Sequence, residues 1–287
     1  MHYKRAKGIL SAKNRMNIYR GCTHGCIYCD SRSEIYNMDH EFEDVEVKEN
    51  ALELLKKAIH SKKEKCIIGT GAMTDPYLPL EKELEYVRKS LKLIDRYGFG
   101  FTCITKSDLV LRDLDLLKSI NNKSRAVVQM TMTTYDEELC RILEPNVSTT
   151  FERFKALKKL NEENIPTVVW MTPILPFIND NKDNIKGIVE YCSEANVYGI
   201  ICFEMGLTLR EGNREHFYSK LDEHFPGIKE KYIRTYGDSY VLPSKRNSQL
   251  MKLFKRKTRE NGILNDSDMI FEYLNKFPKK DIQAKLF

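Results

Sequence analysis

The chain has 287 residues, of which 41 % are hydrophobic and 31 % charged, with a formal net charge of +6. This composition suits one large α/β domain, with or without an extension, and excludes general disorder. No apolar run approaches the roughly 18 residues of a membrane span, and the basic start lacks the apolar stretch of a signal peptide. Eight scattered cysteines favour thiols, metal ligands or buried apolar residues over disulfides, so we expect a cytoplasmic protein.

Short β-branched runs alternate with longer segments that carry apolar residues at helical intervals. This alternation predicts repeated βα units around a parallel sheet. We expect strands at residues 16–19, 66–70, 100–105, 126–131, 167–172 and 199–203. Because a closed eight-stranded barrel needs roughly 200 residues or more of such units, six units favour a partial (β/α)6 barrel of the TIM type.

The alternation sets the expected domain organisation. Residues 1–15 form a basic N-terminal arm, residues 16–206 form the partial barrel, and residues 207–287 form a mainly helical C-terminal extension. Basic residues are dense both in the arm and in SKRNSQLMKLFKRKTR, residues 244–259. Such segments can contact nucleic-acid phosphates, although a solvated surface on a lysine-rich protein explains them equally well.

Chemistry-bearing residues follow the predicted strands. The stretch YRGCTHGCIYCDSRS, which contains Cys22, Cys26 and Cys29, follows the first strand, and Lys106 follows the third. In barrels of this type functional residues gather at the carboxyl ends of the strands. We therefore expect these side chains to share one rim of the barrel.

Three cysteines in the spacing CxxxCxxC are one thiolate short of the usual four ligands of a four-iron cluster, so one iron would stay open to a small molecule. Tyr28 would offer an aromatic surface beside that molecule. Structural zinc usually has four protein ligands in two separated pairs, and no second CxxC occurs in the chain. A zinc site completed by His24 or by a distant thiol stays open as an alternative.

The segment CTHGCIYC after a first strand resembles the signature of the radical S-adenosylmethionine (SAM) superfamily. The resemblance implies that Cys22, Cys26 and Cys29 bind a [4Fe–4S] cluster whose open iron binds SAM. It further implies reductive cleavage of SAM to a 5′-deoxyadenosyl radical, which abstracts hydrogen from a substrate. An external one-electron donor of the flavodoxin or ferredoxin type is implied as a partner.

Four further segments resemble the spore photoproduct lyase-like group, also labelled DNA repair photolyase-like. They are GTGAMTDPYLPLE, ITKSD, TMTTYDEELCRILEP and MTPILPFIND, at residues 69–81, 104–108, 131–145 and 171–180. The resemblance implies that Thr74 and Asp75 hold the amino group of SAM and that Lys106 lies near its carboxylate. Strand alternation places Gln129 and Thr131 on one face, where they would contact the ribose unless they are ordinary strand residues.

Two departures from that lyase separate this chain from it. Ala72 stands where the lyase has its hydrogen-donating cysteine, and Asp30 stands where it has a tyrosine, so we do not expect spore photoproduct repair. Cys202 is a candidate replacement donor, since it shares a strand face with Glu204, although buried cysteines are usually small apolar residues. Tyr77 is a candidate substrate or relay contact, with packing as its alternative role.

The basic termini and the family resemblance favour nucleic acid as the substrate class. Two alternatives remain at this stage. The first is the same chemistry on a peptide or small metabolite, and the second is a non-catalytic interaction protein with a structural metal. The sequence predicts no oligomeric state.

Overall fold

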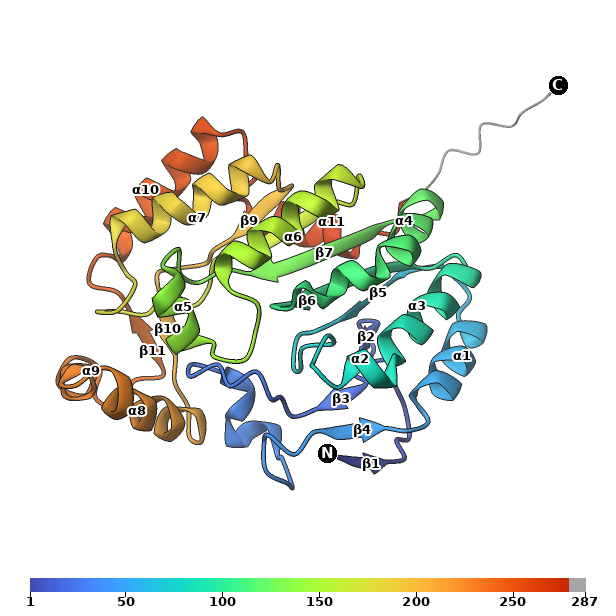
Figure 1. The fold of residues 1–287 in the computed structure, drawn as a ribbon, viewed down its shortest axis with the longest axis horizontal. Helices are drawn as coiled ribbons and strands as arrows, with labels where there is room; N and C mark the ends of the chain where they lie inside the picture. The colour runs from blue at the N-terminus through green and yellow to red at the C-terminus, as the bar shows by residue number, and fades with distance from the viewer. Residues whose placement is uncertain (279–287) are drawn as a thin grey trace.

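A computed structural model describes residues 1–278 of the chain (Figure 1). Its centre is a sheet of six parallel strands whose spatial order follows their order in the chain. The strands are Arg15–Met16 (β2), Ile67–Thr70 (β5), Gly100–Thr105 (β6), Ala126–Thr131 (β7), Thr167–Trp170 (β8) and Gly199–Ile201 (β9). This arrangement confirms the predicted α/β class and the partial TIM-type barrel.

Helices cover the outer face of this sheet (Figure 1). The longer ones are Ala51–Ser61 (α1), Tyr86–Arg96 (α3), Leu114–Lys123 (α4), Thr150–Glu162 (α6) and Lys182–Glu194 (α7). Shorter helices between the strands are Glu81–Leu84 (α2), Glu137–Leu143 (α5) and the 3₁₀ helix Asp108–Asp113 (η3). Two more 3₁₀ helices, Asp30–Arg32 (η1) and Glu34–Tyr36 (η2), follow Cys29 outside this layer. All six residues of β7 are buried, as parallel strands covered on both faces require.

The first predicted strand, residues 16–19, is wrong as a single strand. Met16 in β2 pairs with Thr70 of the barrel, whereas Tyr19–Arg20 (β3) belongs to a second sheet. That sheet joins β3 to Glu46–Lys48 (β4) and to His2–Lys4 (β1). The chain leaves the barrel after Met16, because the carbonyl of Ile18 accepts a hydrogen bond from Lys48 in β4. His2–Lys4, within the predicted N-terminal arm, thus form an edge strand of this second sheet.

The C-terminal part is mainly helical, as predicted, and it returns to the barrel. Its elements are Gly206–Thr208 (β10), Asn213–His224 (α8), Ile228–Tyr236 (α9), Val241–Pro243 (β11), Asn247–Glu260 (α10) and Ser267–Asn275 (α11). Helix α10 packs against α7 and α11 against β9, while β10 and β11 form an antiparallel pair. The predicted extension also covers residues 279–287, which lie outside the described residues. Within residues 1–278 no helix is both long and apolar enough to cross a membrane.

A second hydrophobic cluster, separate from the main barrel core, supports residues 21–29, the loop that carries Cys22, Cys26 and Cys29 and is here called the cysteine loop. It packs Ile27 and Tyr28 of that loop against Leu143 of α5 and against Phe217 and Tyr232 of α8 and α9. Burial of such large side chains contributes roughly 1.5–3 kcal/mol each. The C-terminal helices thus hold the cysteine loop in place.

Candidate cofactor-binding site

The three cysteines lie on the loop between β3 and η1. The backbone N–H of Cys22 donates to the carbonyl of Phe42 over 2.8 Å, and that of Ile27 donates to Leu143 over 3.0 Å. Gly21 has φ of +90°, and a Cβ there would lie 2.6 Å from the Phe42 oxygen. Only glycine fits this close approach, so the backbone itself fixes where the loop begins.

The spacing of the sulfur atoms separates a cluster from a single zinc ion. Within residues 1–278, two groups of three metal-ligand atoms lie within 4.8 Å of one another; both consist of histidines and carboxylates, and neither includes a cysteine. Thiolates on one tetrahedral zinc, each at about 2.3 Å, would lie about 3.8 Å apart. At least one pair of the three sulfur atoms is therefore more than 4.8 Å apart, which fits thiolates that bind different irons of one cluster. His24, the suggested fourth zinc ligand, is directed instead at Asp75, with Nδ1 3.5 Å from the carboxylate.

The cysteines line a cavity of about 110 Å³, here called the cysteine cavity. Its wall includes Ala72, Asp75, Lys106 and Thr131. It adjoins a larger, mainly apolar cavity of about 550 Å³, here called the mouth cavity. The residues that line both cavities are Cys26, Cys29, Ser31, Gly71, Ala72, Ile104, Lys106 and Thr131. The predicted rim residues from three successive strands therefore meet in one place.

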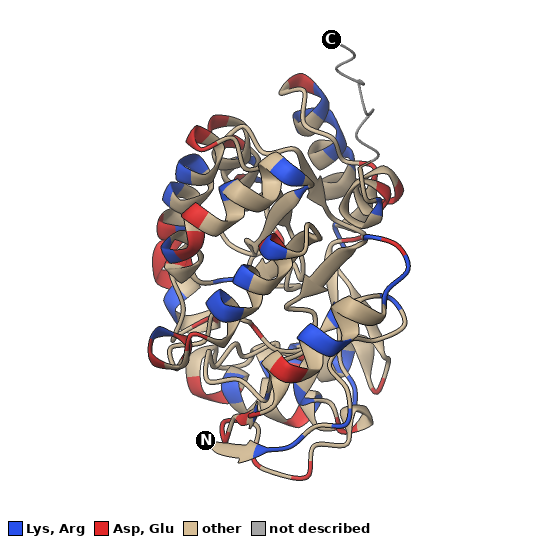
Figure 2. Ribbon diagram, turned by 90° about the vertical axis from the view of Figure 1, so that its right-hand side faces the viewer, with Lys and Arg blue, Asp and Glu red and all other residues tan. Residues whose placement is uncertain are grey.

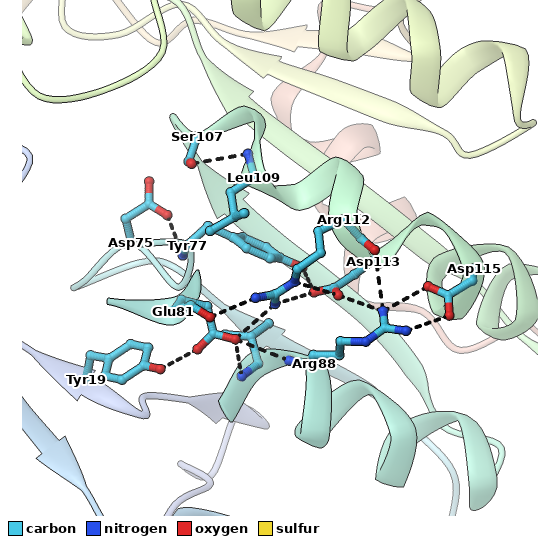
Figure 3. Close-up of polar contacts among 11 residues, drawn as sticks. Tyr19, Asp75, Tyr77, Glu81, Arg88, Ser107, Leu109, Arg112, Asp113 and Asp115 are labelled. Atoms are coloured by element: carbon cyan, nitrogen blue, oxygen red, sulfur yellow. Dashed lines mark hydrogen bonds and ion pairs between the residues drawn. The ribbon is translucent and has the colours of Figure 1, made fainter. Parts of the chain in front are cut away.

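Asp75 has little capacity left for a ligand. Its carboxylate accepts hydrogen bonds from the hydroxyl of Thr105 (2.7 Å), the backbone of Lys106 (2.7 Å) and the backbone of Tyr77 (2.9 Å). Figure 3 shows the contact with Tyr77. With His24 beside it, nearly all acceptor positions of the carboxylate are used. Asp75 thereby fixes the backbone from which the Lys106 side chain extends.

Lys106 lines both cavities, and Tyr28 lies beside it in the wall of the mouth cavity. The ammonium of Lys106 is 5.8 Å from the centre of the Tyr28 ring, within the range of a cation–π contact. Thr131 lines the same wall, at the end of β7. Of the predicted SAM contacts, these three and Asp75 are brought together.

Gln129 and Thr74 are placed differently. The Gln129 amide donates to Thr102 over 2.7 Å and accepts from the indole N–H of Trp170 over 2.8 Å. Its polar atoms are therefore engaged in orienting Trp170, which lines the mouth cavity. Thr74 lines a separate cavity of about 280 Å³, together with Arg20 and Lys48.

The two predicted catalytic residues, Cys202 and Tyr77, lie outside the cysteine cavity. Strand β9 ends at Ile201, so alternation no longer applies, and the prediction that Cys202 and Glu204 share a strand face is wrong. Glu204 lines the mouth cavity, whereas the Cys202 sulfur is buried 3.9 Å from that of Met251, and burial raises its pKa to about 12.

Tyr77 is buried in the main core, and its hydroxyl donates to Asp113 over 3.3 Å (Figure 3). Burial raises its pKa well above the ordinary value. The position of Tyr77 thus agrees with a packing role. Neither Tyr77 nor Cys202 lines the cysteine cavity or the mouth cavity.

A fully buried ion pair beneath the cavity was missed by the sequence analysis. Arg153 of α6 pairs with Glu144 and donates to the carbonyls of Lys106 (3.2 Å) and Thr131 (2.8 Å), while Glu144 accepts from the hydroxyl of Tyr28. Burial raises the pKa of Glu144, and the Arg153 guanidinium opposes that rise. This hub, Glu144 with Arg153, joins the cysteine loop to the ends of β6 and β7.

A second polar network lies behind the site, beyond Tyr77 (Figure 3). Buried Glu81 accepts from Tyr19 and from Arg112, which also pairs with buried Asp113, and Arg88 links Asp113 to the surface. This outer network fixes α2 and η3 against α3. None of these hydrogen bonds and ion pairs reaches Cys22, Cys26 or Cys29.

Comparison with known proteins agrees with this geometry. The model of the radical SAM superfamily matches residues 16–192, and the chain belongs to that superfamily. As a member of that superfamily, it is an enzyme of the radical SAM type. A mutant spore photoproduct lyase with bound AdoMet and dinucleoside spore photoproduct has a similar fold, with a TM-score of 0.61 at 12 % identity over 86 % of this chain and 73 % of that one. Another mutant of that lyase gives 0.63 at 13 % identity, covering 85 % and 72 %.

Two sequence relatives are themselves uncharacterized proteins. One from Methanocaldococcus jannaschii is 36 % identical over 174 residues, which are 60 % of this chain and 64 % of the relative. One from Mycobacterium tuberculosis is 26 % identical over 236 residues, 79 % of this chain and 68 % of the relative. The chain thus spans about two thirds of the length of these relatives. The predicted family and the spore photoproduct lyase-like fold are confirmed, while the reaction and substrate belong to the proposal that follows.

Proposed function

We propose that the chain binds a [4Fe–4S] cluster through Cys22, Cys26 and Cys29 and cleaves SAM reductively in the cavity beside it. The observation that carries the proposal is that these cysteines share one cavity with Lys106 and Thr131. When bound, the cluster and SAM supply an electron and a 5′-deoxyadenosyl radical, which abstracts hydrogen from the substrate. The reaction uses an external one-electron donor of the flavodoxin or ferredoxin type and takes place in the reducing cytoplasm.

The chain's own residues bind and orient SAM. The Lys106 ammonium attracts the carboxylate of SAM in a site shielded from water, where such an attraction is stronger than at the surface. Asp75 keeps Lys106 in position, and the ring of Tyr28, in the wall of the mouth cavity, lies beside the Lys106 ammonium. Thr131 offers a hydroxyl towards the ribose. Gln129 acts through Trp170, whose indole it holds at the mouth cavity.

The mouth cavity is the proposed substrate site. Its wall carries Trp170 and Phe203, whose rings lie 6.1 Å apart, and Phe203 is exposed. Exposed aromatic rings of this kind stack on nucleobases. The similar lyase binds a dinucleoside photoproduct, so we favour a nucleic-acid substrate over a peptide or metabolite. Because Ala72 lies in the wall where that lyase has its donor cysteine, we do not propose spore photoproduct repair.

The basic helix α10 supplies a test of the nucleic-acid preference. Lys255 and Arg256 are exposed there, while Arg256 and Lys257 pair with Glu260. On the face viewed in Figure 2, basic and acidic residues are interspersed. Oligonucleotide binding should weaken steeply with salt and on replacing these three cations with glutamine. If no oligonucleotide binds even at low ionic strength, the substrate is instead a peptide or a small metabolite.

The activity itself is tested by anaerobic reconstitution with iron and sulfide, reduction with dithionite, and chromatography for 5′-deoxyadenosine after SAM is added. Wild-type protein should produce 5′-deoxyadenosine, and Cys29→Ala should produce none while keeping the folded barrel. If a fully loaded cluster yields none even with candidate substrates, the alternative of a non-catalytic metal-binding interaction protein gains support.

A further inference from the structure

We propose a second metal site, for a zinc-type divalent ion, formed by His2, His40 and Asp44 beside the N-terminal sheet. One ligand atom from each of these residues lies within 4.8 Å of the other two. Two imidazoles and one carboxylate form a set of ligands typical of zinc and other first-row transition ions. The site lies outside the cysteine cavity, and the inference does not depend on the proposed reaction.

His40 provides the strongest observation. Its Nδ1 lies 3.0 Å from the carbonyl oxygen of Glu41 and therefore carries the proton, since a carbonyl only accepts. In the tautomer with its proton on Nδ1, the ring has a lone pair at Nε2, an atom that is buried and has no hydrogen-bond partner among the described residues. Metal-binding histidines are oriented in this way by a hydrogen bond from their other ring nitrogen.

The surroundings of this lone pair favour a cation over a further acceptor. Asp39 lies 4.0 Å from Nε2, and ligand atoms of Asp39, His40 and Glu46 form a second group within 4.8 Å. These carboxylate oxygens cannot donate to Nε2. Three carboxylates, those of Asp39, Asp44 and Glu46, lie here, and Lys4 and the Met1 amino group pair with them. Lys48 and Arg20 also interact with Glu46 and Asp39.

His2 completes the site from a different part of the chain. Its Nδ1 is 2.8 Å from the Asp44 carboxylate, and its ring meets that of His40 edge-to-face with centres 4.8 Å apart. His2 and Asp44 are partly exposed, so an ion reaches the site from solvent. Phe42, whose carbonyl accepts from Cys22, lies between His40 and Asp44 in the chain. A bound ion would therefore fasten the segment that supports the cysteine loop to β1.

The test uses the full chain without a polyhistidine tag, with Cys22, Cys26 and Cys29 replaced by alanine so that the loop thiolates do not bind zinc. We expect one equivalent of Zn²⁺, and Co²⁺ absorption bands of nitrogen and oxygen ligands without thiolate charge transfer. His40→Ala should weaken Zn²⁺ binding at least about 100-fold, and Asp44→Asn about 10-fold or more.

The matched control is His60→Ala. Nδ1 of His60 also lies near a carbonyl oxygen, that of Lys56 at 2.7 Å, but His60 belongs to neither ligand group found within residues 1–278. Its replacement should leave zinc affinity unchanged, and circular dichroism of the metal-free variants checks their folding. Amide hydrogen exchange of residues 38–46 should slow with Zn²⁺, except in His40→Ala. The proposal is overturned by equal affinity of the His40→Ala and His60→Ala proteins, by absence of binding, or by equal competition from Mg²⁺.

Discussion

Two buried carboxylate–arginine networks in this barrel have similar chemistry but different surroundings. Glu144 with Arg153 contacts Lys106 and Thr131, which line the cysteine cavity, and Tyr28, which lies beside Lys106 in the wall of the mouth cavity. In the outer network, Glu81 and Arg112 contact structural groups, and Arg112 remains about one-fifth exposed. The position of a buried ion pair, and not its composition, therefore decides whether it supports a binding site. Variants in each network separate these roles.

The largest effect should come from Glu144→Gln. This change leaves the fully buried Arg153 guanidinium without a counter-charge, which costs about 3–5 kcal/mol in the free energy of unfolding. Because the hub also holds Tyr28 of the cysteine loop, iron bound per chain after reconstitution should fall as well. Urea unfolding and iron analysis measure the two effects. A variant that loses less than about 1 kcal/mol would contradict the role of the hub.

Glu81→Gln should have a smaller effect. Arg112 keeps Asp113 as a partner and reaches solvent, so we expect a loss of about 1–2 kcal/mol in the free energy of unfolding. Iron content and SAM affinity should stay at wild-type values, because Glu81 contacts no residue of the cysteine cavity wall. Reduced iron content at unchanged folding would remove the distinction between the two networks.

Tyr28→Phe and Tyr77→Phe form a matched pair, each removing one buried hydroxyl that donates to a carboxylate. Each should lower the free energy of unfolding by about 1 kcal/mol. Only Tyr28→Phe should weaken SAM binding several-fold, since the Glu144 contact holds the Tyr28 ring beside Lys106. Equal SAM affinities, measured by equilibrium dialysis under anaerobic conditions, would show that the hub does not position the site.

The mildest test concerns α8, which supports the cysteine loop from outside both networks. Burial lowers the pKa of His216 to about 4. As the pH falls below about 6.5, the unfolded chain gains a proton at this residue that the folded chain accepts only near pH 4, so folding stability decreases across that interval. His216→Gln should reduce the drop in melting temperature between pH 7 and pH 5 by roughly 2–4 °C. His60→Gln, at an exposed histidine, should leave the drop unchanged.

The sequence predicted five of the six barrel strands and the rim that gathers the cysteines, Lys106 and Thr131, because these depend on local periodicity and on where parallel strands end. It failed where the chain leaves regular structure. The alternation argument for Cys202 required a strand that continues past Ile201, and β9 ends there. Residues 16–19 are divided between two sheets because β4, distant in sequence, pairs with β3.

The sequence does contain one sign of the buried pair Glu144 and Arg153. Arg153 occupies the same helical face as Leu157 and Leu160 in α6, where an arginine indicates a buried partner. Glu144 follows α5 and is separated from Arg153 by a loop, so sequence spacing alone does not pair them. The candidate metal site is hidden for a similar reason, since His2 and His40 meet only through the pairing of β1 with β4.

The central claim, that SAM binds at a cluster held by the three cysteines, is tested most directly by electron paramagnetic resonance. The spectrum of the reconstituted, dithionite-reduced protein is recorded with and without SAM, for wild type and for Lys106→Ala. We predict a reduced four-iron signal whose g values change when SAM is added, and a much weaker change at the same SAM concentration in Lys106→Ala. A fully loaded cluster whose spectrum is the same with and without saturating SAM would contradict the account.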